Sequence, residues 1–396
     1  MNMNEQMKES EENILHTYNR FPVVFEKGQG CYLYDSEGKE YLDFAAGIAV
    51  NSLGYHYPGY DEALKDQIDK LMHISNLYYN EPIIEAGAKL VKASKMSKAF
   101  FTNSGTEAIE GALKAAKKYA YVRDGHADHE IIAMNHSFHG RSIGALSVTG
   151  TAHYREPFEP LMGGVKFADF NDLESVKAQI TDKTCAIITE VVQGEGGIYP
   201  AKREFLEGLR QICDEKDIML IFDEIQCGMG RTGYYFAWQA YGVQPDIMTS
   251  AKALGCGVPV GAFVLNEKAA KASLEPGDHG TTYGGNPFVC AAVSKVFEIY
   301  ENDKIIEHVQ EMTPYLEQKL DEIVAKHECA ATRRGMGFMQ GIVIQGRPVG
   351  EVVKAALAKG LLVISAGSDV LRIVPPLVIT KEHIDKMASI LDECME

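Results

Sequence analysis

Short, continuous apolar runs alternate with stretches of helical spacing between about residues 60 and 266. The apolar runs lie at residues 98–103, 130–135, 164–169, 184–192, 218–222, 246–251 and 261–266. Helical spacing is seen at residues 60–73, 81–94, 106–121, 172–180 and 202–217. Continuous apolar strands separated by helices predict an α/β fold with a mostly parallel central sheet that is buried on both faces.

The pattern changes near residue 290. Helices are predicted at residues 289–302, 304–326, 349–359 and 380–394, and strands at 335–345 and 370–379. This succession predicts a smaller α+β domain. Near the N-terminus, apolar residues alternate on both sides of the turn SEGK, which predicts a β-hairpin over residues 30–44. We expect an N-terminal segment (1–50) that packs with the small domain, a large domain (51–290) and the small domain (291–396).

The composition is that of a globular protein with an acidic surface. The 396 residues are 46% hydrophobic and carry a formal net charge of −16. Because nucleic acids and anionic membranes attract Lys and Arg, this charge argues against both as main partners. No apolar run approaches the length of a membrane span, and the N-terminus is polar and acidic. We therefore expect a cytoplasmic protein.

The eight cysteines are irregularly spaced, and none forms a CxxC pair. Reduced thiols in the cytosol are the expected state for such a set. No metal site is expected.

Asp223 and Lys252 each lie at the end of an apolar run, 29 residues apart. Taken singly, each is an ordinary strand end. Together, a carboxylate and an amine beside one cleft are what an enzyme that uses pyridoxal phosphate needs. The amine forms a Schiff base with the cofactor aldehyde, and the carboxylate keeps the pyridine nitrogen protonated.

Three further strands deliver polar or aromatic residues to the same predicted edge. Ser104 opens a helix within SGTEA, either as an ordinary helix cap or as part of a phosphate site. Phe138 and Arg141 follow the next strand, where they are either core and surface residues or a ring-stacking and carboxylate-binding pair. Glu190 and Glu195 follow another strand. Ligands of open α/β sheets bind at the carboxyl ends of strands, so this convergence favours a site.

Two segments outside these strand ends are also candidates. The loop HGTTYGGNP offers the adjacent hydroxyls of Thr281 and Thr282, either for phosphate oxygens or as a plain loop. Arg372 lies in an apolar run and needs a partner or a ligand, and Glu195 is the candidate for a structural ion pair. The glycines at 255–261 lack the GxGxxG spacing and precede a strand, which argues against a dinucleotide-dependent dehydrogenase.

These residues together resemble the class III pyridoxal phosphate aminotransferases, which have the fold-type I architecture of a large domain with a mostly parallel sheet and a smaller α+β domain. The resemblance runs from residue 18 to residue 377. It rests on the strings FFTNSGTEAIEGALK, FHGRS, VVQGEGG, DEIQCGMGRTG, AKALGCGVPVGA and HGTTYGGNP. Within the class, the sequence resembles the acetylornithine aminotransferases of arginine biosynthesis.

The resemblance implies a cofactor-binding role for several residues. Lys252 would carry pyridoxal 5′-phosphate and later move a proton, and Asp223 would pair with the pyridinium nitrogen. Gln226 would lie near the phenolic oxygen O3′, and Phe138 would stack on the ring.

The resemblance also implies a homodimer with shared active sites. Gly105 and Thr106 would hold the cofactor phosphate, with Thr282 reaching it from the neighbouring subunit. Arg141, with Thr281 nearby, would bind the α-carboxylate of an ω-amino substrate.

The same resemblance implies that Glu195 pairs with Arg372 in one half-reaction and releases it for 2-oxoglutarate in the other. The expected reaction moves the δ-amino group of N2-acetyl-L-ornithine to 2-oxoglutarate, giving N-acetyl-L-glutamate 5-semialdehyde and L-glutamate.

Substrate choice rests on one position in the loop AAGIAVN. Ornithine aminotransferases of this class commonly have Tyr where this chain has Ile48, which disfavours free ornithine and suits an acylated donor. Succinyl-diaminopimelate is a possible further acylated donor. A γ-aminobutyrate aminotransferase also fits Ile48 and is the alternative, together with an ornithine aminotransferase. A non-catalytic dimer that binds the cofactor is disfavoured because no proposed group is missing.

Overall fold

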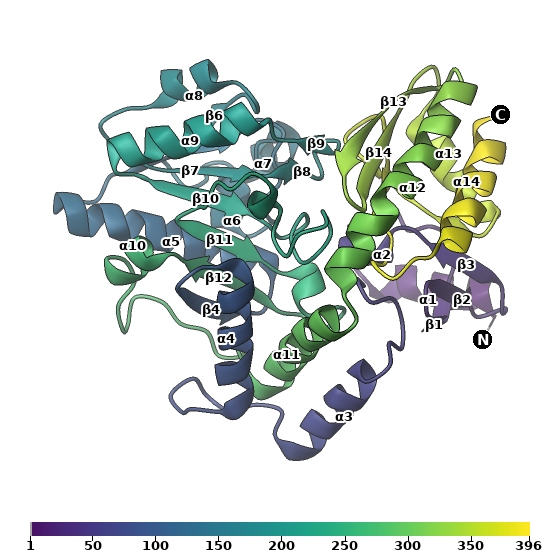
Figure 1. The fold of residues 1–396 in the computed structure, drawn as a ribbon, viewed down its shortest axis with the longest axis horizontal. Helices are drawn as coiled ribbons and strands as arrows, with labels where there is room; N and C mark the ends of the chain where they lie inside the picture. The colour runs from purple at the N-terminus through teal and green to yellow at the C-terminus, as the bar shows by residue number, and fades with distance from the viewer. Residues whose placement is uncertain (1) are drawn as a thin grey trace.

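The N-terminal residues form a small sheet that includes a strand from the far end of the chain. In the computed structural model, which describes residues 2–396, α1 (Met3–Asn13) precedes β1 (Phe25–Gln29), β2 (Tyr32–Asp35) and β3 (Glu40–Asp43). β2 and β3 form the predicted hairpin. β3 also pairs in parallel with β15 (Leu361–Leu362), so the hairpin lies against the C-terminal part of the chain (Figure 1).

A seven-stranded sheet forms the centre of the molecule, with the strand order β4-β12-β11-β10-β7-β5-β6. Its strands are β4 (Lys98–Thr102), β5 (Glu130–Met134), β6 (Val165–Ala168), β7 (Thr184–Glu190), β10 (Met219–Asp223), β11 (Ile247–Ser250) and β12 (Gly261–Leu265). β12 runs antiparallel to both of its neighbours, and the other pairs are parallel. The predicted mostly parallel sheet is confirmed.

Helices cover both faces of this sheet (Figure 1). The helices that contact its strands are α4 (Glu81–Ser94), α5 (Gly105–Asp124), α8 (Leu173–Gln179), α9 (Arg203–Lys216) and α10 (Glu267–Lys271). Next to them, α11 (Pro287–Asn302) packs on α4, and α3 (Tyr60–Lys70) packs on α11. Successive strand residues face opposite sides, so one strand serves two cores. In β10, Met219 and Ile221 pack into the core that includes α5, whereas Leu220 and Phe222 pack into the other core.

The C-terminal part contains a four-stranded sheet with the order β13-β14-β17-β16. Its elements are α12 (Ile305–Lys326), β13 (Ala330–Met336), β14 (Met339–Ile344), α13 (Val349–Ala358), β16 (Ile364–Ala366), β17 (Val370–Ile373) and α14 (Lys381–Met395). We propose the domain division near residues 50 and 290. The seven-stranded sheet and this C-terminal four-stranded sheet are formed by separate parts of the chain, which supports the division.

The strand predicted at residues 335–345 is confirmed as β14, but its Gly-rich start is wrong, because the chain turns back there. Gly337, at φ +58°, joins β13 to β14, and a Cβ there would lie 2.6 Å from the Arg231 carbonyl oxygen. β13 was not predicted because its sequence, AATRRGM, lacks the apolar alternation expected of a strand.

Several short elements connect the larger ones. They are α2 (Ala46–Ala49), α6 (Ile143–Ser147), α7 (Ala152–Arg155), β8 (Val192–Gln193), β9 (Tyr199–Pro200) and the 3₁₀ helices η1 (Glu156–Phe158), η2 (Ala237–Ala240) and η3 (Lys252–Leu254). Among the described residues, no helix is both long enough and apolar enough to cross a bilayer.

The close packing of α5 on β12 generates a stability prediction. A Cβ added to Gly111 would lie 2.2 Å from the Phe263 ring, so Gly111→Ala forces helix and sheet apart. We expect the free energy of unfolding, measured by urea titration, to fall by about 1–3 kcal/mol. Gly87→Ala in α4 is the control, because its Cβ would meet only one ring atom at 4.0 Å. That substitution should be neutral or stabilising by up to about 1 kcal/mol, and an equal loss in both variants would contradict the packing argument.

Candidate active site

A cavity of about 490 Å³ lies at the carboxyl ends of the parallel strands. Most of the residues selected from the sequence line it, namely Ser104, Gly105, Thr106, Phe138, Arg141, Glu190, Glu195, Asp223, Gln226 and Lys252. Arg372 lies just outside and contacts two of the lining side chains. Thr281 accepts a hydrogen bond from Asn103, itself a lining residue, at 3.3 Å, whereas Thr282 is exposed and does not line the cavity.

Asp223 is buried at the end of β10, and both of its carboxylate oxygens are hydrogen-bonded. Oδ1 accepts from the Ile225 backbone N–H at 3.0 Å and from the Thr249 hydroxyl at 3.1 Å. Oδ2 lies 2.7 Å from Nδ1 of His139. These contacts come from three segments of the chain and fix the orientation of the carboxylate.

Lys252 begins η3, two residues after β11. Its φ of +50° lies in the left-handed region that favours glycine, and such backbone strain is characteristic of functional sites. Burial lowers the pKa of its amine to about 8. The side chain is therefore a partly neutral amine near neutral pH, in the form that can attack an aldehyde or accept a proton.

The start of α5 forms a cradle for an anion. Ser104 caps the helix by accepting from the Glu107 N–H at 3.3 Å, as the first interpretation of the sequence predicted. A Cβ on Gly105 would lie 2.9 Å from Ile225, so a larger residue would displace that neighbour. The Thr106 hydroxyl lies 2.7 Å from the Ser142 hydroxyl. Small residues, hydroxyls and helix N–H groups together fit a phosphate, so the two interpretations of SGTEA are compatible.

Arg141 is positioned by two aromatic rings. Its guanidinium lies 3.8 Å from the centroid of the Tyr154 ring and 5.4 Å from that of Phe138. No carboxylate of residues 2–396 forms an ion pair with Arg141, so its charge is available to an anionic ligand. Phe138 is half-buried at the cavity wall, where its ring can stack on a planar ligand.

Glu195 and Arg372 form the ion pair that the sequence suggested, across 177 residues of chain. The second contact joins Nη2 of Arg372 to Oε2 of Glu195 at 3.2 Å. Gln226 bridges the pair, because its Nε2 donates to Glu195 at 3.2 Å and its Oε1 accepts from Arg372 at 3.1 Å. Burial pushes the pKa of Glu195 upward, but the charge of Arg372 outweighs this effect and holds the pKa below its usual value.

His139 and Glu190 form a buried layer behind Asp223. Burial by itself would lower the pKa of His139, but the hydrogen bond and charge of Asp223 outweigh it and raise that pKa. Glu190 accepts from the Gly194 N–H at 3.1 Å, and burial raises its pKa to about 7. His139 was not among the predicted site residues, although it lies between Phe138 and Arg141 in the motif HSFHGR, because nothing local shows that it reaches a residue 84 positions away.

Ile48 does not line the inner cavity. It lies in the turn of α2 at φ +67°, is 43% exposed, and lines a second cavity together with Arg372. The residue selected for substrate choice therefore lies on the outer side of the Glu195–Arg372 pair.

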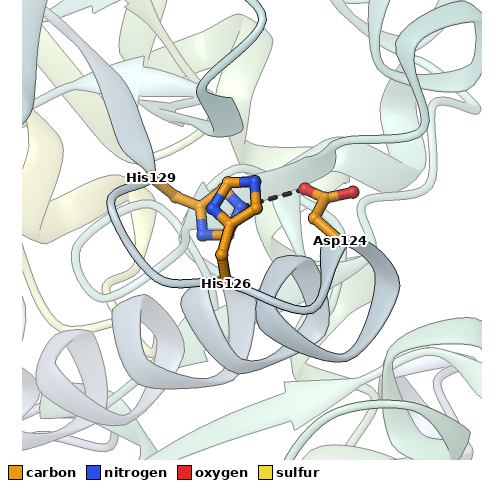
Figure 2. Close-up of side chains that lie close together, drawn as sticks. All are labelled: Asp124, His126 and His129. Atoms are coloured by element: carbon orange, nitrogen blue, oxygen red, sulfur yellow. Dashed lines mark hydrogen bonds and ion pairs between the residues drawn. The ribbon is translucent and has the colours of Figure 1, made fainter.

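A separate cluster of Asp124, His126 and His129 lies at the last residue of α5 and in the loop that follows (Figure 2), whereas the cavity is lined by Gly105 at the start of that helix. The potential metal-binding atoms of its three side chains lie within 4.8 Å of one another. However, Arg123 donates to both oxygens of Asp124 at 2.6 Å, and His129 Nε2 lies 2.9 Å from one of them. Because Arg123 already neutralises that carboxylate, we interpret the cluster as an ion-pair network that joins the last residues of α5 to the loop that follows.

Comparisons with known proteins place these observations in a family. The family model described as "Aminotransferase class-III" matches residues 14–395. The acetylornithine aminotransferase of Clostridium acetobutylicum is 47% identical over 388 residues, which cover 98% of this chain and 100% of that protein.

Solved structures of similar proteins superpose on this chain over nearly its whole length. The ornithine aminotransferase of Toxoplasma gondii superposes with a TM-score of 0.95 at 28% identity, covering 100% of this chain and 95% of that one. The N-acetylornithine aminotransferase of Stenotrophomonas maltophilia gives a TM-score of 0.84 at 35% identity, with 98% of both chains covered. Ornithine and acetylornithine enzymes both share this fold, so the fold alone does not select the donor.

The raised pKa of Glu190 generates a prediction about pH. Because the folded state binds this proton more tightly than the unfolded chain, ionisation removes stability as the pH rises from about 4.5 to about 7. The loss is at most about 3 kcal/mol. As the pH rises from 5 to 8, the unfolding free energy of Glu190→Gln, measured by urea titration, should therefore increase by about 1–3 kcal/mol relative to that of the unsubstituted protein. Glu174→Gln, at a side chain that is 82% exposed, is the control and should show no such trend; a flat difference for Glu190→Gln would refute the shift.

Proposed function

The chain belongs to the class III aminotransferases, and from this membership we propose that it transfers the δ-amino group of N2-acetyl-L-ornithine to 2-oxoglutarate. The products are N-acetyl-L-glutamate 5-semialdehyde and L-glutamate, a step of arginine biosynthesis. Succinyl-diaminopimelate is proposed as a further acylated donor. The observation that carries the proposal is the convergence of Lys252 and Asp223 on one cavity beside the anion cradle of α5.

We propose pyridoxal 5′-phosphate as the cofactor, because the donor set of the cavity suits each of its parts. When bound, it withdraws electrons from the carbon that carries the substrate amine, so that a proton on that carbon can be removed. Lys252 would hold the aldehyde carbon, and Asp223 would keep the ring nitrogen protonated. Gly105 and Thr106 would bind the phosphate.

Two side chains of the cavity wall would complete the cofactor site. Phe138 would stack on the ring, and Gln226 would approach the phenolic oxygen. His139 holds Asp223 through its second carboxylate oxygen, which fixes the carboxylate that would pair with the ring nitrogen.

Lys252 is also the proposed base for proton transfer at the substrate carbon. An ordinary lysine with a pKa near 10.4 is almost wholly protonated at pH 8. Because burial lowers the pKa of Lys252 to about 8, about half of the amine is neutral at that pH. The enclosed cavity thus supplies a base without a further side chain.

Arg141 and Arg372 would divide the substrate carboxylates between them. Arg141, with Thr281 nearby, would bind the α-carboxylate of the donor, and Glu195 would meanwhile keep Arg372 neutralised. In the second half-reaction, Glu195 would release Arg372 to bind 2-oxoglutarate. The ion pair observed here is the arrangement suited to the donor half-reaction.

The choice of an acylated donor rests on Ile48 and on the names of the similar proteins. An apolar residue at this position offers no partner for the second amine of free ornithine. The 47% identity to a protein named acetylornithine aminotransferase favours the same donor. γ-Aminobutyrate and free ornithine remain the alternative donors, and they would leave the fold and the cofactor assignment unchanged. A dimer that binds the cofactor without turnover is a more distant alternative, because the cavity lacks no proposed group.

We propose a homodimer, which an exposed apolar patch supports. Leu77, Tyr78 and Tyr79 are 87%, 64% and 95% exposed, and Tyr283 is 62% exposed beside Thr282. Large apolar side chains gathered on one surface mark interaction sites. Burial of this patch by a second copy would let Thr282 reach the cofactor phosphate of the partner subunit. We also propose a cytoplasmic location, which the eight free thiols support.

The donor assignment is tested by comparing amino transfer to 2-oxoglutarate from acetylornithine, succinyl-diaminopimelate, ornithine and γ-aminobutyrate. We expect kcat/KM for acetylornithine to exceed those for ornithine and γ-aminobutyrate by at least about tenfold. Lys252→Ala should lower kcat more than about a hundredfold with every donor and abolish the absorbance band of the covalently held cofactor. A higher kcat/KM for γ-aminobutyrate would overturn the donor assignment.

Ile48 can be tested in the same assay. Ile48→Tyr should shift the ratio of kcat/KM values toward free ornithine, whereas Ile48→Val, which keeps an apolar side chain, should leave it unchanged. No shift with tyrosine would remove Ile48 from the argument.

The dimer is tested by sedimentation velocity. We expect a dimer for the unsubstituted chain and a shift toward monomer for Tyr79→Glu, because a carboxylate in the buried patch would lose its water. Tyr121→Glu, at a 50% exposed tyrosine outside the patch, is the control and should leave the dimer intact. A dimer unaffected by Tyr79→Glu would place the interface elsewhere.

A further inference from the structure

A second cavity, of about 1150 Å³, lies on the outer side of the Glu195–Arg372 pair. Its walls come from the N-terminal segment, from Ile48 and from one face of α13. Arg372 lines this cavity, whereas its partner Glu195 lines the inner one. The ion pair therefore forms the boundary between the two cavities.

The outer cavity has a one-sided charge. Its lining includes the cations Arg20, Lys39, Lys354 and Arg372, and no aspartate or glutamate of the described residues. This contrasts with a chain that carries 55 acidic and 39 basic residues. It contrasts also with the inner cavity, which is lined by side chains of both signs. The outer cavity is thus a local cationic region on an acidic protein.

Two of the four cations keep a free charge. Glu195 neutralises Arg372, and Glu11 lies 3.3 Å from Arg20. In contrast, Lys39 donates only to the neutral Ala358 carbonyl, at 2.8 Å, and no ion pair involves Lys354 anywhere in residues 2–396.

Neither lysine forms an ion pair with an acid of the cavity wall, although the charge of Lys39 also acts on Asp35 outside the lining. The nearest acid along α13, Glu351, already pairs with Arg347 at 3.7 Å and lies outside the lining. The apolar side chains of Phe21, Val353 and Leu357 form much of the remaining wall. Walls of low polarity focus the field of a charge into the space that they enclose.

We propose that this outer cavity is the vestibule through which 2-oxoglutarate reaches the site, and that Lys39 and Lys354 attract it there. The inference rests on the proposed function, in which Arg372 binds this acceptor. 2-Oxoglutarate carries two negative charges, whereas acetylornithine carries one carboxylate and one ammonium group and is neutral overall. The lysines therefore favour the acceptor over the donor. An anion that enters this cavity comes up to Arg372, which forms part of its wall and is neutralised there by Glu195.

Steering of this kind has a definite kinetic signature. Attraction between a dianion and two cations raises the rate of association and weakens as salt screens the charges. It does not alter the chemical step, so kcat should be unchanged. A neutral donor should show neither the dependence on the lysines nor the dependence on salt.

The test uses the double variant Lys39→Gln/Lys354→Gln and the single variant Lys354→Gln, each reconstituted with pyridoxamine 5′-phosphate. Rapid mixing with 2-oxoglutarate then measures the acceptor half-reaction without any donor. At low ionic strength we expect the second-order rate constant to fall about three- to tenfold in the double variant and less in the single one. At about 0.5 M salt the Debye length shrinks to about 4 Å, so the difference between the variants should vanish. The donor half-reaction with acetylornithine should be unchanged in both variants.

Lys216→Gln is the matched control. It removes the same charge from an exposed position on α9, which lies far from α13 (Figure 1). This variant should leave both half-reactions unchanged. The vestibule would be overturned if Lys216→Gln lowered the rate constant as much as the double variant does. It would also be overturned if the loss were equal with donor and acceptor, or if it persisted at high salt. Because the acceptor half-reaction needs no donor, a failure of the acetylornithine assignment would be seen separately, in the donor half-reaction.

Discussion

The hydrogen bonds that hold the Asp223 carboxylate join the parts of the active site into one unit. They connect the end of β10 to Thr249 of β11 and to His139 in the loop after β5. Because these contacts hold the carboxylate in one orientation, they also fix the positions of Thr249 and His139 around it. The anion cradle at the start of α5 and the amine of Lys252 are placed relative to that carboxylate because their strands belong to the same sheet.

Burial then differentiates side chains that would otherwise behave alike. Glu190 ends β7 and Glu195 lies five residues later, yet burial raises the pKa of Glu190, whereas Arg372 holds that of Glu195 down. Burial also lowers the pKa of Lys252. The cavity thus contains an amine whose pKa is lowered together with Glu195, whose pKa is held below its usual value, and a lowered amine pKa suits proton transfer near neutral pH.

The Glu195–Arg372 pair separates two spaces of different electrical character. The inner cavity offers both signs of charge and suits chemistry on a zwitterionic amine, whereas the outer cavity is cationic and suits a dicarboxylate. A transaminase uses one site for two substrates in turn, so a neutralised arginine at the boundary is a physical means of telling them apart. In the proposed mechanism, the placement of a few charges therefore separates the donor from the acceptor.

Most elements of the fold and the candidate residues of the central chemistry could be predicted from the sequence, because both depend on patterns among residues that are close in the chain. Apolar periodicity located most helices and strands, and polar residues at strand ends identified Lys252 and Asp223. Periodicity did not reveal the strand β13, since its stability comes from pairing with β14. The folded chain, in contrast, brought His139 to Asp223, placed Ile48 outside the inner cavity and gathered lysines from distant segments around one space. These features, like the pKa of Lys252, depend on contacts and burial between residues far apart in the chain, which no local pattern encodes.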